Sequence, residues 1–150
     1  MLAFSFCLRC GIIGLMAKVG SSMERDEFSR IRRYLGKSQS QLARLLCISP
    51  KAIQSFEEGW RPIPAYAERQ LLFLLSVSRA MDKNTTSCWE ITDCPIKWRE
   101  NCFVWEFKVR DFCWFLTGTF CQGEYKSSWV DKMKLCRQCK VYQLMIPRMI

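Results

Sequence analysis

Apolar residues recur at helical spacing from Met23 onward, and stop signals divide this pattern into separate helices. Phe28, Ile31 and Leu35 follow one another three or four residues apart behind an acidic first turn, and Gly36 ends the run. This spacing predicts a first helix of about twelve residues, one face of which is buried.

Two shorter helices are predicted next, each introduced by a capping serine. Ser38 precedes the apolar face of residues 39–46, and Ser49 followed by Pro50 opens a third helix that stops at Gly59. Both helices are short, and the third has a polar outer face.

A fourth and longer helix is predicted over residues 65–78. Its five successive apolar residues, 71–75, cover more than one face of a helix, which is wider than one core needs. We expect part of this helix to pack either on a second subunit or on the C-terminal half of the same chain.

Composition changes near residue 81, because five of the six tryptophans and seven of the ten cysteines lie beyond it. The predicted fold class is therefore mainly α, with an N-terminal domain of four to five helices and a small, irregular, cysteine-rich C-terminal domain. The expected boundaries are an extension or mis-called start over 1–22, a helical domain over 23–80, a polar linker over 81–87, a cysteine-rich domain over 88–142 and a tail over 143–150.

The first 22 residues are typical neither of a signal peptide nor of a membrane anchor. They lack a basic opening segment, and their apolar run is far shorter than the roughly 20 residues that span a bilayer. We therefore expect a cytoplasmic protein with no membrane partner, and we leave Cys7 and Cys10 out of any site.

The C-terminal cysteines predict a metal or redox centre, and the chain contains no histidine. Seven thiols cannot all form disulfide pairs, because one of them would be left over. Only Cys136 and Cys139 have the two-residue gap that is common in zinc sites. An iron–sulfur cluster is the expected cofactor, zinc is the alternative, and buried thiols without metal stay possible. The expected ligands are Cys88, Cys94, Cys102, Cys113, Cys121, Cys136 and Cys139.

The N-terminal half carries a family pattern in residues 38–62, and a net charge of +9 for the chain favours anionic partners. The pattern consists of Ser38-Gln39, Leu42-Ala43, Ile48-Ser49, Ile53, Phe56-Glu57, Gly59 and Pro62. It resembles the Cro-type (lambda-repressor-like, XRE family) helix-turn-helix domains. Cys47 stands where that family commonly has glycine, so we expect either a left-handed backbone there or a slightly different turn.

This resemblance implies that the third helix enters the major groove of double-stranded DNA and that the protein is a homodimer. The resemblance implies that base edges are read by Lys51, Gln54 and Ser55. It also implies that phosphate is contacted by Gln39 and Arg61. Ser49, at the start of the same helix, completes the expected interface.

The C-terminal half is similar to the two-CW domain, a small cysteine-rich module of bacterial proteins. The resemblance covers residues 88–142 and rests on Cys88-Trp89, Cys94-Pro95, Cys102, Cys113-Trp114, Gly118-Thr119, Cys121, Cys136, Cys139 and Val141-Tyr142. It implies a compact module joined to regulatory partners but does not identify a ligand.

No enzyme is expected. Without histidine there is no Cys/His pair, and neither an acid–base motif nor a phosphate-binding glycine loop is present, so no small-molecule substrate is evident. The predicted function is a bacterial, sequence-specific DNA-binding transcriptional regulator whose metal domain senses redox state or cluster supply. The alternatives are an iron–sulfur electron-transfer module and a zinc-stapled protein-interaction module.

Overall fold

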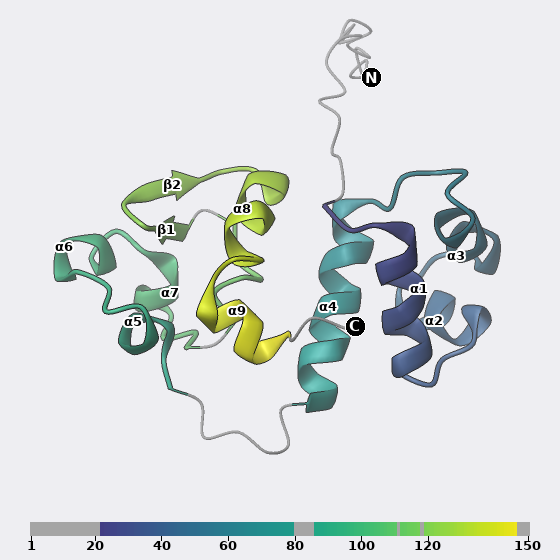
Figure 1. Cartoon of the computed structure of the whole chain (residues 1–150), viewed down its shortest axis with the longest axis horizontal. Coiled ribbons are helices and arrows are strands. Elements are labelled where there is room, and N and C mark those ends of the chain that lie inside the picture. Colours follow the sequence, from purple (N-terminus) through teal and green to yellow (C-terminus); the bar gives the residue numbers. More distant parts are fainter. Residues whose placement is uncertain (1–21, 80–85, 111, 118, 147–150) are drawn as a thin grey trace, which may run out of the picture.

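The computed structural model describes residues 22–79, 86–110, 112–117 and 119–146, and these residues are mainly helical. Two lobes lie along the long axis of the molecule, and helix α4 (Ala65–Arg79) stands between them (Figure 1). The extension expected over 1–21 and most of the expected linker lie outside the described residues.

The N-terminal lobe contains α1 (Arg25–Tyr34), α2 (Gln39–Leu45) and α3 (Pro50–Glu57), and α4 lies beside α1 on the side of the C-terminal lobe. The expected caps are present. The Ser38 hydroxyl accepts a hydrogen bond from the Gln41 N–H, while the Gln41 side chain accepts one from the Ser38 N–H. At the start of α3, the Ser49 hydroxyl accepts from the Ala52 N–H. Local signals therefore define the limits of α2 and α3.

One apolar core holds these helices together. Phe28, Leu42, Ile53 and Leu71, one from each helix, are fully buried. On the outside of this core, the Arg32 guanidinium donates two hydrogen bonds, of 2.6 and 2.9 Å, to the Glu57 carboxylate and so ties α1 to α3.

The turn between α2 and α3 has a left-handed backbone at Cys47, whose φ is 53°, which is one of the two geometries expected there. A residue with a Cβ is strained in this region, and glycine is not. The cysteine therefore keeps the geometry of the turn at a cost in free energy.

The C-terminal lobe is built from short elements. Three four-residue helices, α5 (Cys88–Ile91), α6 (Ile96–Arg99) and α7 (Phe103–Glu106), precede an antiparallel hairpin of β1 (Thr119–Cys121) and β2 (Glu124–Lys126). Helices α8 (Trp129–Cys136) and α9 (Lys140–Met145) follow and lie between the hairpin and α4 (Figure 1).

Both expected boundaries of the C-terminal domain need correction. Ser87, assigned to the linker, is buried, and its N–H and hydroxyl donate to the Glu90 carboxylate at the start of α5. At the other end, α9 runs past residue 142, and Met145 and Ile146 are buried rather than part of a tail. At the first boundary a local signal exists, since Ser87 and Glu90 form a capping box, whereas tertiary packing of Met145 and Ile146 decides the second.

The wide apolar face of α4 packs on the C-terminal lobe. The Phe73 ring lies 5.8 Å from that of Phe112 and 5.6 Å from that of Phe115, and the buried residues of both lobes form one continuous core. Of the two arrangements expected for α4, packing within the chain is the one observed. In the described part of the chain, no helix is both long and apolar enough to cross a membrane.

Candidate nucleic-acid interface and thiol pocket

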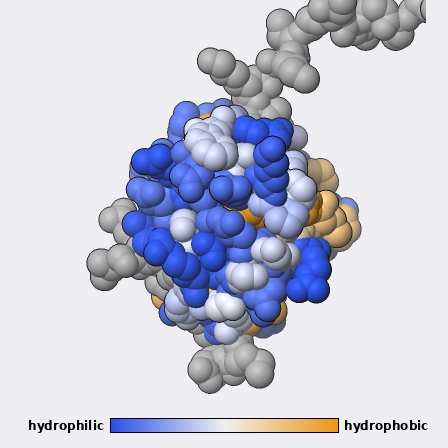
Figure 2. All heavy atoms as spheres, turned by 90° about the vertical axis from the view of Figure 1, so that its right-hand side faces the viewer, coloured by the Kyte–Doolittle hydropathy of each residue, from blue (hydrophilic) through white to orange (hydrophobic). Residues whose placement is uncertain are grey.

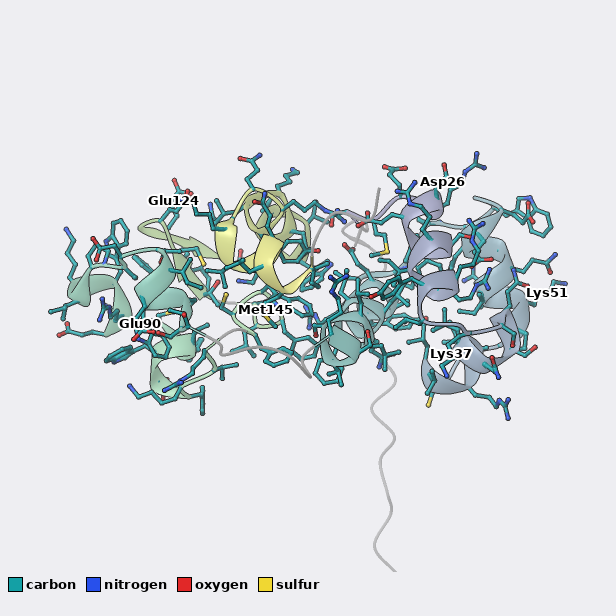
Figure 3. All side chains as sticks on the ribbon, turned by 60° about the horizontal axis from the view of Figure 1, so that its bottom comes forward. Asp26, Lys37, Lys51, Glu90, Glu124 and Met145 are labelled. Carbon is teal, nitrogen blue, oxygen red and sulfur yellow. The ribbon has the colours of Figure 1, made fainter. Side chains whose placement is uncertain are left out.

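Helix α3 lies at the free end of the N-terminal lobe, where its polar side is open to solvent. Lys51 and Gln54 are exposed, and Lys51 points away from the body of the molecule, far from Glu90 and Glu124 of the other lobe (Figure 3). The surface at this end of the molecule is mostly hydrophilic (Figure 2). These two side chains can reach a partner without rearrangement.

Two of the expected contact residues are already engaged. Ser55 is 7% exposed, and its hydroxyl donates to the Lys51 carbonyl at 2.8 Å, so it is not the base-reading residue that the sequence suggested. The Gln39 carboxamide nitrogen donates to Glu57 Oε2 at 2.8 Å, which holds this side chain against the Arg32–Glu57 pair. Gln39 is only half-buried, and its expected phosphate contact stays a prediction.

Ser49 and Arg61 flank α3 at its two ends. The Ser49 hydroxyl accepts from the Ala52 N–H at 3.1 Å, as a helix cap does, while its residue is exposed. Arg61 is exposed, and its backbone N–H donates to the Ser55 carbonyl, which fixes the segment that follows the helix. The exposed set thus consists of Ser49, Lys51, Gln54 and Arg61.

In the other lobe, all seven predicted cysteine ligands line one cavity of about 200 Å³. The structure therefore brings together thiols that are up to 51 positions apart in the sequence, from Cys88 to Cys139. Aromatic side chains close the cavity, among them Trp98, Trp114 and Phe120. The Trp98 ring packs on Gly123, where a Cβ would lie only 2.9 Å from the ring and where φ is 80°.

The thiols surround the cavity without meeting at one point. All eight cysteines of the described residues are free, and in that part of the chain no three histidine, cysteine or acidic side chains are close enough to hold one metal ion. The site is thus a cavity lined by thiols, of which Cys88 and Cys113 are neighbours.

Burial favours the neutral thiol. It raises the pKa of Cys136 to about 12, and it is also the main reason why the pKa values of Cys94 and Cys121 are raised. For Cys113, the neighbouring Cys88 side chain, followed by burial, raises the pKa well above that of an ordinary thiol. Any metal that binds here must displace protons.

One buried cation stands beside these thiols. Lys132 of α8 is fully buried, and its Nζ donates to Thr119 Oγ1 at 2.5 Å. Thr119 is also fully buried, and its Oγ1 lies 3.3 Å from the Cys121 sulfur. The cysteine pattern gave no hint of this pair.

The thiol pocket is joined to the N-terminal lobe through Arg137, which lies between Cys136 and Cys139. Its guanidinium donates to both carboxylate oxygens of Glu27 on α1, at 2.9 and 3.0 Å, and lies 3.6 Å from Glu68 of α4. Cys136 and Cys139 thus line the pocket, while Arg137 between them forms the junction with the N-terminal lobe.

Glu68 is the centre of this junction and is fully buried. Its carboxylate accepts from the Trp129 indole N–H at 2.9 Å and from the Ser22 N–H and hydroxyl. Arg69, the next residue, stacks on the Trp129 ring at 4.4 Å. A buried carboxylate needs such donors, and these come from both lobes.

Sequence reasoning missed Glu68, Lys132 and Arg137. A signal did exist for Glu68, since it lies one turn before Leu71 and Leu72 and so falls on the buried face of α4. Lys132 is likewise one turn from Trp129 and from Cys136. A charged residue at a position where helical spacing predicts a buried side chain is therefore a signal for a functional or structural role.

No model of a protein family, no curated protein and no solved structure matches this chain. The two resemblances therefore depend on the residues quoted for them.

Proposed function

We propose that this protein is a sequence-specific DNA-binding transcriptional regulator and that its C-terminal lobe binds an iron–sulfur cluster. The observation that carries the proposal is the combination of an exposed α3 behind a capped α2 in one lobe with seven thiols around one cavity in the other. Helix-turn-helix domains present such a helix to the major groove.

The spread of the thiols around the cavity fits a cluster better than a single zinc ion. Zinc–sulfur bonds of about 2.3 Å require four sulfurs within roughly 4 Å of one another, whereas no three ligands of the described residues converge in this way. A cluster places several irons and sulfides between its thiolates, so its ligands stand further apart. The buried Trp114 Nε1–H, which has no partner among the described residues, is a donor that such a centre can use.

Signalling between the lobes would pass through the segment Cys136-Arg137-Gln138-Cys139. Arg137 can respond to the ligation of its neighbours Cys136 and Cys139, and it holds Glu27 of α1, which belongs to the DNA-binding lobe. A change in the centre would therefore alter how α1 to α3 are presented to DNA, as coupling between two sites requires. A homodimer on a two-fold site is part of the proposal.

The first test of the metal is the content of iron, zinc and acid-labile sulfide in protein purified without oxygen, with a visible spectrum. Iron, sulfide and absorbance near roughly 400 nm support the cluster. Colourless protein that carries zinc would instead make the lobe a zinc-stapled module. Protein without either metal would contradict the proposal for this lobe.

The DNA-binding half is tested by selecting a binding site from random duplexes and measuring the affinity of variants. Lys51→Ala and Gln54→Ala should each weaken binding, because a base contact is worth about 1–3 kcal/mol, or roughly 5- to 150-fold. Lys134→Ala removes an equal charge from the exposed side of α8 and should change affinity little. Equal losses in Lys51→Ala and Lys134→Ala, with no loss in Gln54→Ala, would indicate a mere charge effect and contradict the assigned reading helix.

A further inference from the structure

Lys132 carries a positive charge in the interior of the C-terminal lobe. The side chain is 0% exposed, and no carboxylate of the described residues forms a salt bridge with it. Its hydrogen-bond partner is the neutral hydroxyl of Thr119. A buried ammonium without a counter-charge is costly, so its presence calls for an anion nearby.

Negative charge would arise in the neighbouring thiol pocket when a metal displaces the protons of its thiols. Lys132 acts electrostatically on Cys113, Cys121 and Cys136, and in each case its charge favours the thiolate. These three residues come from different parts of the lobe, and all line the cavity. The lysine itself does not line the cavity, but its charge acts on three of the expected ligands.

The hydrogen bonds run in one direction from the ammonium to a sulfur. An ammonium has no acceptor, so Thr119 Oγ1 must accept from Lys132 and its own proton is free to point at the Cys121 sulfur, 3.3 Å away. A hydroxyl that donates to a thiolate stabilises the charged form. The geometry therefore gives the Cys121 sulfur a hydrogen-bond donor that would stabilise its charge when it binds a metal.

We infer that Lys132 and Thr119 are positioning residues of the thiol pocket, which orient the Cys121 sulfur through a hydrogen-bonded relay and stabilise negative charge on a thiolate-bound metal centre. The inference rests on the proposed metal-binding function and deepens it. An iron–sulfur centre becomes one unit more negative when it takes up an electron, so a fixed positive charge nearby raises its reduction potential.

The test uses full-length protein purified without oxygen and reconstituted with iron and sulfide. Its reduction potential is measured by titration with dithionite while the visible spectrum is recorded. Lys132→Met and Thr119→Val should both shift the potential to more negative values. Lys134→Met, on the exposed side of the same helix, should leave it unchanged. If zinc is the bound metal, the readout is zinc affinity, measured by competition with a chelator. Lys132→Met and Thr119→Val should then lose affinity by roughly 10- to 100-fold.

Metal-free protein provides the check on folding. Lys132→Met should be as stable to urea as the wild type, or more stable, because it removes an uncompensated buried charge from the empty pocket. A folded Lys132→Met protein whose potential and metal retention equal those of the wild type would overturn the role of Lys132. A wild type that takes up neither iron nor zinc would instead contradict the proposed function itself, and this role with it.

Discussion

At the scale of single residues, burial favours the protonated form of the Cys136 thiol. Burial raises the pKa of Cys136 from 9.0 to about 12, so the unfolded chain loses this proton at a lower pH than the folded one. A raised pKa contributes stability below pH 9, and that contribution is lost as the pH rises toward 12. Metal-free protein should therefore become less stable in alkaline solution, by up to about 1.4 kcal/mol per pH unit for each such thiol.

The measurement is urea unfolding of reduced, metal-free protein at several pH values from about 8 to 10.5. Cys136→Ala should show a shallower loss of stability with pH than the wild type, since it removes one group whose pKa differs between the two states. Cys47→Ala, which removes an exposed thiol, should keep the wild-type slope. If Cys136→Ala lost stability with pH as steeply as the wild type, burial would not be what raises the pKa of Cys136.

At the scale of elements, the two halves of the chain differ in how far the sequence predicts them. The N-terminal helices have strong local signals, such as the Ser38–Gln41 capping box and Pro50 at the start of α3, and they were predicted to within a few residues. Ser55 was misplaced because it lies at the edge of the apolar arc, where spacing alone does not decide between core and solvent.

The C-terminal elements gave no comparable signal. Helices α5, α6 and α7 have four residues each, and left-handed residues such as Asp93, Lys108 and Gln122 separate the elements of this lobe. Such short helices depend on tertiary contacts rather than on propensity. Cysteine spacing predicted which thiols would gather, but not the charged partners Lys132 and Arg137 that surround them.

The turn between α2 and α3 offers a test at this scale. Because Cys47 has a φ of 53°, Cys47→Gly should stabilise the N-terminal lobe by up to about 1 kcal/mol, whereas Cys47→Ala should not. The gain is limited because glycine also loses more backbone entropy on folding. Urea unfolding of the two variants compares them directly, and a glycine variant no more stable than the alanine variant would argue against strain in this turn.

At the scale of the whole molecule, the lobes share one core and one polar junction. Glu68, Trp129 and Arg137 connect α4 with α8, and Arg137 reaches α1 through Glu27. If the lobes separated, Glu68 would exchange the Trp129 indole N–H for water, and a hydrogen bond to a charged group contributes about 1.5–3 kcal/mol net. This contribution opposes independent motion of the lobes.

The junction predicts how the state of the pocket reaches the DNA. If Arg137 carries the coupling, Arg137→Gln should bring the DNA affinities of metal-loaded and metal-free protein closer together, while the metal content stays at the wild-type level. Its guanidinium fork binds both oxygens of Glu27, a contact that glutamine cannot reproduce. Gel-shift titrations of both forms measure the ratio of affinities.

Gln138→Ala is the matched control, because Gln138 is exposed and lies in the same motif between Cys136 and Cys139. It should preserve the wild-type ratio, since it leaves the contact with Glu27 intact. A ratio unchanged in Arg137→Gln would mean that the two lobes act independently or communicate through the apolar contacts of Phe73 alone. Reciprocity adds a second readout: DNA should alter metal affinity in the wild type by the same factor, and by less in Arg137→Gln.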